Sequence, residues 1–87
     1  MTADLKSKLI AQLSDEISDA EWYMTRATEA KNGGDALLSV GLQRIALEEY
    51  SHARFLRHSL LREGVQIPPN DEAGYKNVWL LMKSRED

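Results

Sequence analysis

The segment Glu48-Glu49-Tyr50-Ser51-His52 places a carboxylate and an imidazole three residues apart. On an α-helix, Glu49 and His52 would lie about 60° apart around the axis and about one turn apart along it, so both side chains would reach one point. A carboxylate and an imidazole that converge are suitable ligands for a transition-metal ion. The pair therefore predicts part of a metal site, whose remaining ligands must come from elsewhere.

Glu49 and His52 interrupt what is otherwise the apolar stripe of a helix. The stripe advances by three and four residues through Leu38, Leu42, Ile45, Glu49, His52, Leu56 and Ser59. An earlier segment has a similar stripe with one ionisable member, made of Leu9, Leu13, Glu16, Ala20, Tyr23 and Ala27. A carboxylate on a core face is costly unless it is paired, protonated or bound to a cation. We therefore expect Glu16, Glu49 and His52 to be the metal ligands and the catalytic residues.

The same residues also have metal-free interpretations. Glu49 can pair with Arg54 or Arg57 on a solvated face, while His52 packs as an ordinary core histidine. Tyr23 follows Glu16 by about two turns, so it either donates its hydroxyl to a ligand or packs as a core aromatic residue. These interpretations stay open at the level of sequence.

Acidic residues flank Glu16 on the same predicted helix. Asp15, Asp19 and Glu21 form a band that either guides cations toward the ligands or is simply a solvated face.

The chain predicts three helices. Residues 3–31 contain no Gly or Pro, and Asn32-Gly33-Gly34 provides a turn after which Asp35 can cap a second helix over 36–63. Gly64 ends that helix, and the two prolines at 68–69 prevent another from starting before residue 70. A third, shorter helix then presents an apolar face for contacts between dimers, formed by Tyr75, Val78, Trp79 and Met82, with Leu80 and Leu81 as a second apolar patch.

Residues 1–87 therefore form one all-α domain, an antiparallel two-helix hairpin followed by a short C-terminal helix. One hairpin cannot cover both apolar stripes, so we expect two copies to dimerise into a four-helix bundle. Di-iron and di-manganese bundles take one Glu from each of two helices and a Glu-x-x-His from each of the other two. This chain holds half of that set, and a twofold dimer would complete it.

Composition excludes several other classes of protein. The chain has no cysteine, which excludes thiolate zinc sites and iron–sulfur clusters within it. A net charge of -3 with scattered Lys and Arg gives no basic surface for nucleic acid or an anionic membrane. The first residues mix charged and apolar side chains, unlike a signal peptide, so we expect a cytoplasmic protein.

Two segments give the chain a resemblance to a known family. They are Glu16-Ile17-Ser18-Asp19-Ala20-Glu21-Trp22-Tyr23 and Glu48-Glu49-Tyr50-Ser51-His52-Ala53. Over roughly residues 9–62 the chain resembles the ferritin-like superfamily, and within it the short encapsulated ferritins. The resemblance implies a ferroxidase centre at a subunit interface, with Glu16, Glu49 and His52 as iron ligands and Tyr23 beside them. It also implies half-ferritins that pair, and pairs that form a ring, commonly of ten subunits.

The chain departs from this family at two places. The family has an acidic metal-entry site beside the Trp, at positions matching Asp15 and Ser18, and Ser18 is not an acid. We therefore take Asp15, Asp19 and Trp22 as the candidate entry residues. Encapsulated ferritins also end in a small, apolar peptide that docks them inside a protein shell, whereas this sequence ends Lys83-Ser84-Arg85-Glu86-Asp87. Either such a peptide has been removed or the protein works without a shell, so an encapsulin-type shell is a possible partner that the resemblance alone implies.

The expected function is oxidation of Fe(II) at a di-iron site between two subunits, for iron storage or detoxification. A rubrerythrin-like peroxidase or a dimanganese catalase on the same scaffold is one alternative, because carboxylate and imidazole ligands also suit manganese. A metal-free helical interaction module is the other.

Overall fold

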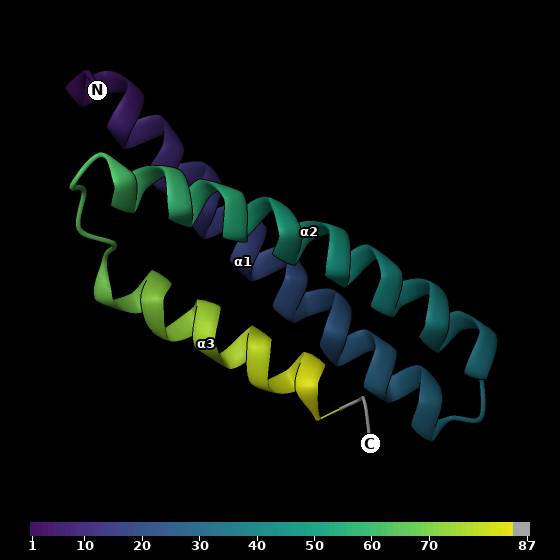
Figure 1. The fold of residues 1–87 in the computed structure, drawn as a ribbon. Coiled ribbons are helices and arrows are strands. Elements are labelled where there is room, and N and C mark those ends of the chain that lie inside the picture. Colours follow the sequence, from purple (N-terminus) through teal and green to yellow (C-terminus); the bar gives the residue numbers. More distant parts are fainter. Residues whose placement is uncertain (85–87) are drawn as a thin grey trace.

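The computed structural model describes residues 1–84 and consists of three helices (Figure 1). Helix α1 spans Ala3–Asn32, α2 spans Ala36–Arg62 and α3 spans Pro69–Lys83. Helices α1 and α2 form a long antiparallel hairpin, and α3 folds back along it, running antiparallel to α2 (Figure 1). The predicted all-α class and the hairpin with a short third helix are confirmed. The terminal residues Arg85, Glu86 and Asp87, on which the comparison with a shell-docking peptide rests, lie outside the described residues.

Glycine and aspartate define the hairpin turn as the sequence predicts. Gly34 adopts a left-handed φ of 86°, and the side chain of Asp35 accepts a hydrogen bond of 3.0 Å from the backbone N–H of Leu38. Gly64 adopts a φ of 74° just beyond the end of α2. These ends fix the antiparallel alignment of the two long helices, on which any site between them depends.

Helix α3 begins at Pro69, whereas the prolines predict no helix before residue 70 and the sequence favours a start after Asn70 or Asp71, so the prediction is wrong by two or three residues. Proline is well suited to the first helical position, because the N–H that it lacks would have no partner there and its fixed φ already suits a helix. Asp71 and Glu72 in the first turn favour this start, since the N-terminus of a helix carries a partial positive charge.

The two long helices contact each other through small side chains spaced seven residues apart. Buried positions recur in α1 at Leu13, Ala20 and Ala27, and in α2 at Ser39, Ala46, Ala53 and Leu60, a set that we call the hairpin interface. Small side chains allow two backbones to approach closely, and the Ser39 hydroxyl donates a hydrogen bond of 2.8 Å to the carbonyl oxygen of Ala27. A single chain therefore completes this interface by itself.

The apolar stripe predicted for α1 is confirmed, but the stripe predicted for α2 is mostly wrong for the single chain. In α1, Leu13, Glu16, Ala20 and Ala27 are buried, and Leu9 and Tyr23 are half-buried. In α2 only Leu56 of the predicted stripe is buried. The remainder lies about 60° around the axis from the hairpin interface.

We call five residues of that remainder the open stripe, namely Leu38, Leu42, Ile45, Glu49 and His52. The sixth, Ser59, is half-buried nearer the end of the helix. Leu38 and Ile45 are 51% and 38% exposed. Leu38 and Ile45, two of the large apolar residues of α2, are therefore not among those that α1 covers.

Helix α3 packs on the hairpin through Val78, which is fully buried in the core. The Tyr75 ring stacks on that of Tyr50 at a centroid distance of 5.0 Å. Gly74 lies so close to α1 that a Cβ atom there would approach Ile17 Cγ2 to 2.9 Å.

Val78 is fully buried in its own hairpin, so it is not available for contacts between dimers as predicted. Tyr75 and Met82 pack against the same core but are only half-buried, and their role between dimers stays a prediction. Trp79 and Leu80 stay exposed. No helix within residues 1–84 has the length and apolarity required to span a bilayer.

Candidate metal centre

The three predicted ligands converge where the middle of α1 faces the middle of α2. Glu16 comes from α1, and Glu49 and His52 come from successive turns of α2. One carboxylate oxygen from each Glu and one imidazole nitrogen of His52 all lie within 4.8 Å of one another. The convergence follows directly from the hairpin alignment and from the three-residue spacing of Glu49 and His52.

Glu16 is the buried member of the group, with 9% of the residue exposed. Its Oε1 atom accepts a hydrogen bond of 2.9 Å from Nε2 of Gln12, one turn earlier on α1. Its Oε2 atom lies 3.5 Å from Nδ1 of His52, is enclosed, and accepts no hydrogen bond when Glu49 is ionised. Enclosed polar atoms almost always have a partner, so this oxygen is a candidate ligand atom for a cation.

The two carboxyl groups compete for one proton. A hydrogen bond with Glu16, burial, and repulsion by the carboxylates of Glu16 and Asp19 together raise the pKa of Glu49 to about 7, against a smaller opposing effect of His52. Burial disfavours the charge of Glu16, but hydrogen bonds with Glu49 and Gln12 and the proximity of His52 outweigh it and lower the pKa of Glu16. Near neutral pH the pair thus holds a proton that a cation can replace.

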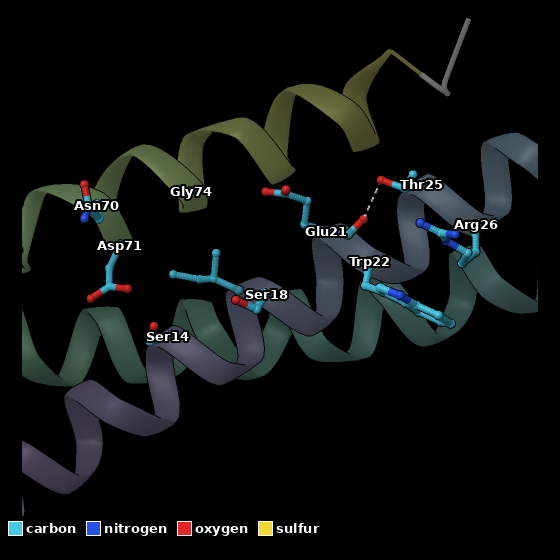
Figure 2. Close-up of a pocket in the computed structure, with 10 residues that line it drawn as sticks. Ser14, Ser18, Glu21, Trp22, Thr25, Arg26, Asn70, Asp71 and Gly74 are labelled. Carbon is cyan, nitrogen blue, oxygen red and sulfur yellow. Dashed lines mark hydrogen bonds between the residues drawn. The ribbon is translucent and has the colours of Figure 1, made fainter.

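The candidate entry residues do not gather at one place. Asp19 lies close enough to Glu49 to affect its charge, and Asp15 is exposed on α1. Trp22 lies about 120° around the axis from Glu16 and lines a different feature, a cleft of about 430 Å³ between α1 and the start of α3 (Figure 2). Ser18 lines the same cleft. Of the entry residues, Asp19 alone is shown to act on a ligand.

Tyr23 is half-buried on the side of α1 that carries Glu16. Its ring meets the ring of Trp22 edge to face at a centroid distance of 5.1 Å. The aromatic interpretation of Tyr23 therefore has a contact to support it, whereas its role beside the ligands stays a prediction.

Two parts of the metal-free interpretations differ from the structure, whereas the pairing of Glu49 with Arg54 stays a prediction. Arg57 binds Glu72 of α3 with two hydrogen bonds from Nε, at 2.9 and 3.2 Å, so it does not serve Glu49. The side chain of His52 is 61% exposed, so it is not a core histidine of the single chain.

Gln12 was not predicted from the sequence, although its position four residues before Glu16 is the spacing at which helical side chains meet. Its contact with Glu16 is the one direct hydrogen bond that the ligand group receives from a neighbouring amide within the described part of the chain.

The ligand group lies at an open edge of the molecule. Leu38, Ile45 and His52 of the open stripe are exposed, whereas Leu42 and Glu49 are half-buried. Three protein ligands leave coordination positions free for solvent, substrate or a second protein surface. Comparisons with models of protein families, with curated proteins and with solved structures find no match.

Proposed function

We propose that the protein is a ferroxidase in which two copies pair along their open stripes and oxidise Fe(II) at a ferritin-like di-iron centre between them. The observation that carries this proposal is the convergence of Glu16, Glu49 and His52, which each offer one ligand atom within 4.8 Å of the others, at a place where the Oε2 atom of Glu16 is enclosed. The resemblance of residues 9–62 to the encapsulated ferritins supports the choice of iron.

The donor set fits iron. Carboxylate oxygen and imidazole nitrogen bind Fe(II) and Fe(III) as well as manganese, and no thiolate is available in this chain. Two negative charges offset much of the charge of one dication, so the buried position of Glu16 is no longer unfavourable once metal binds. Manganese suits the same donors, which keeps a dimanganese catalase as the second candidate.

The open stripe supplies the reason for pairing. Leu38, Leu42 and Ile45 form an apolar surface directly beside the ligands, and a groove lined by these residues together with Leu37 and Gly41 continues it. A twofold axis through this surface brings together four carboxylates and two imidazoles. Covering the apolar surface and completing the metal site are then the same event.

In this dimer each ligand has a distinct task. Glu16, oriented by Gln12, offers Oε2 from the buried side, and His52 offers its ring nitrogen from the exposed side. Glu49 would release its proton when cations bind, and in the dimer its carboxylate could be shared between two of them.

The metal ions themselves supply the redox chemistry. Two Fe(II) ions give two electrons to one dioxygen, which takes two protons from solvent and leaves as hydrogen peroxide, or they reduce one hydrogen peroxide to water. The ligands hold the two ions together and bind both oxidation states.

Storage of the Fe(III) product requires a compartment that a single dimer does not provide. We infer that dimers assemble into a ring through exposed residues such as Trp79 and Leu80, and that an encapsulin-type shell in the cytoplasm receives the product.

The test is metal content and turnover of the freshly purified protein. Native mass spectrometry should find a dimer or a multiple of it, carrying two iron ions per dimer after anaerobic loading. Oxygen consumption on addition of Fe(II) should exceed any disproportionation of hydrogen peroxide. Faster peroxide disproportionation by the manganese-loaded protein would favour the catalase instead, and a monomer that binds no metal would favour the metal-free module.

A further inference from the structure

Gln12 holds one oxygen of Glu16 and leaves the other free. Its Nε2 atom donates to Oε1 at 2.9 Å, while Oε2 lies 3.5 Å from His52 Nδ1. Both residues belong to α1, where a four-residue spacing places side chains one above the other. The amide therefore fixes the rotation of the Glu16 carboxylate by a contact within a single helix.

A carboxylate that chelates one ion must turn both of its oxygens toward that ion. Here Oε1 accepts the hydrogen bond from Gln12, while Oε2 lies 3.5 Å from His52 Nδ1. Ca²⁺ takes six to eight oxygen ligands and commonly uses bidentate carboxylates, whereas first-row transition ions accept fewer ligands and favour imidazole. The hydrogen bond from Gln12 thus disfavours the binding mode that Ca²⁺ would use.

We propose that Gln12 is a positioning residue that restricts Glu16 to binding metal through Oε2 alone, and so sets the preference of the centre for transition-metal ions over Ca²⁺. This inference rests on the proposed metal centre. Glutamine suits the task because its amide is neutral, donates at every pH and leaves the negative charge of Glu16 to the metal. Gln12 is exposed and contributes little to the core, so its contact with Glu16 is not needed for packing.

The test uses Co(II) as a spectroscopic probe, with Ca²⁺ as competitor, on the intact chain. Gln12→Ala removes the amide, and Gln12→Met keeps a side chain of similar length that cannot donate. Gln43→Ala is the matched control. Like Gln12, Gln43 donates a hydrogen bond from its Nε2 atom to a residue of its own helix four positions away, here to Ser39 Oγ at 3.1 Å. This contact is remote from the candidate ligands. Thermal unfolding without metal should be similar for all four proteins.

Both Gln12 variants should bind Co(II) about tenfold more weakly than the wild type, the usual cost of losing a partner of a metal ligand. Their visible absorption per bound Co(II) should fall, since chelation by Glu16 raises the coordination number, and Ca²⁺ should displace Co(II) more readily. Gln43→Ala should match the wild type in all three measurements.

Unchanged spectra and unchanged Ca²⁺ competition in both Gln12 variants would overturn the inference, even if affinity fell, because a purely structural role moves affinity alone. The same shifts in Gln43→Ala would overturn it too. A wild-type protein that binds no Co(II) would instead remove the proposed metal centre and this inference with it.

Discussion

Helix α2 carries two adjacent faces that differ in size and polarity. The hairpin interface uses the small residues Ser39, Ala46 and Ala53, and all three are buried by α1. The open stripe uses the large residues Leu38 and Ile45, and both stay substantially exposed. Small side chains bring two helices close together, whereas large apolar side chains release more free energy when they are covered. The hairpin interface is thus covered within one chain, while Leu38 and Ile45 remain available for the contact with a second copy that we propose.

The ligands lie on the border between these two faces. Glu16 is buried against the hairpin interface, and His52 is exposed beside the open stripe. A centre at this border is accessible from outside in one chain and becomes enclosed when the open stripe is covered. Under our proposal, metal binding and assembly are therefore linked. The predictions below test either the candidate metal centre or the contacts made by α2.

The largest expected effect is the loss of Fe(II) oxidation in Glu49→Ala. If Glu49 bridges two ions, its removal takes a ligand from both, and oxidation should fall by at least about 100-fold, the upper end of the cost of losing a ligand's partner. Oxygen consumption after addition of Fe(II) is the measurement.

Glu48→Ala is the control, since Glu48 is exposed and precedes Glu49 by one position. It should keep the wild-type rate. An inactive Glu48→Ala beside an active Glu49→Ala would show that the ligand face of α2 has been assigned incorrectly.

Ile45→Glu should break the dimer. A carboxylate placed in a covered apolar contact should raise the dissociation constant at least about 100-fold, equivalent to about 2.8 kcal/mol. Analytical ultracentrifugation over a range of concentrations measures this change.

Leu47→Glu serves as the comparison, because Leu47 is also an exposed apolar residue but lies on the opposite side of α2. Its dimer should remain intact. If Leu47→Glu dissociated the protein and Ile45→Glu did not, the paired surface would lie on the other side of α2.

The contrast also explains what the sequence could and could not predict. The helix ends at Gly34 and Gly64 and the convergence of Glu16, Glu49 and His52 follow from local rules of turn and spacing. These local rules do not predict which face of α2 is covered by α1. Large apolar residues give the strongest periodic signal in the sequence, whereas the closely packed helices meet mainly through alanine and serine. The inward packing of Val78 was missed since it depends on how α3 folds back across the close contact at Gly74, which no periodicity encodes.

Ala53→Leu tests the close packing of α1 against α2 at the hairpin interface. Ala53 is fully buried between α1 and α2, so the added side chain must separate the helices. The free energy of unfolding of the metal-free protein should fall by about 1–3 kcal/mol. Urea unfolding at fixed protein concentration gives this value. Ser51→Leu, on the exposed side of α2, should change it by no more than about 0.5 kcal/mol; equal losses in both variants would mean that the hairpin interface is not closely packed.

The smallest effect concerns pH. The pKa of Glu49 is raised from 4.5 to about 7 in the folded protein, so the folded state holds a proton that the unfolded chain has already released. The free energy of unfolding should therefore decrease as pH rises from 4.5 to about 7 and stay level above that range. Glu16, whose pKa is lowered, acts in the opposite sense, and its contribution is lost only as pH falls below 4.5.

Glu49→Gln separates these contributions, because the amide keeps the size of the side chain but has no proton to release. Thermal unfolding in the presence of a chelator should show the decline toward pH 7 in the wild type and a weaker decline in Glu49→Gln. With metal present, the free energy of unfolding of the wild type should instead increase as pH rises toward 7. Deprotonation of Glu49 then strengthens metal binding, and bound metal stabilises the folded state. Identical pH profiles for the two metal-free proteins would mean that Glu49 and Glu16 share no proton. A binding cation would then displace no proton from Glu49, contrary to the proposal.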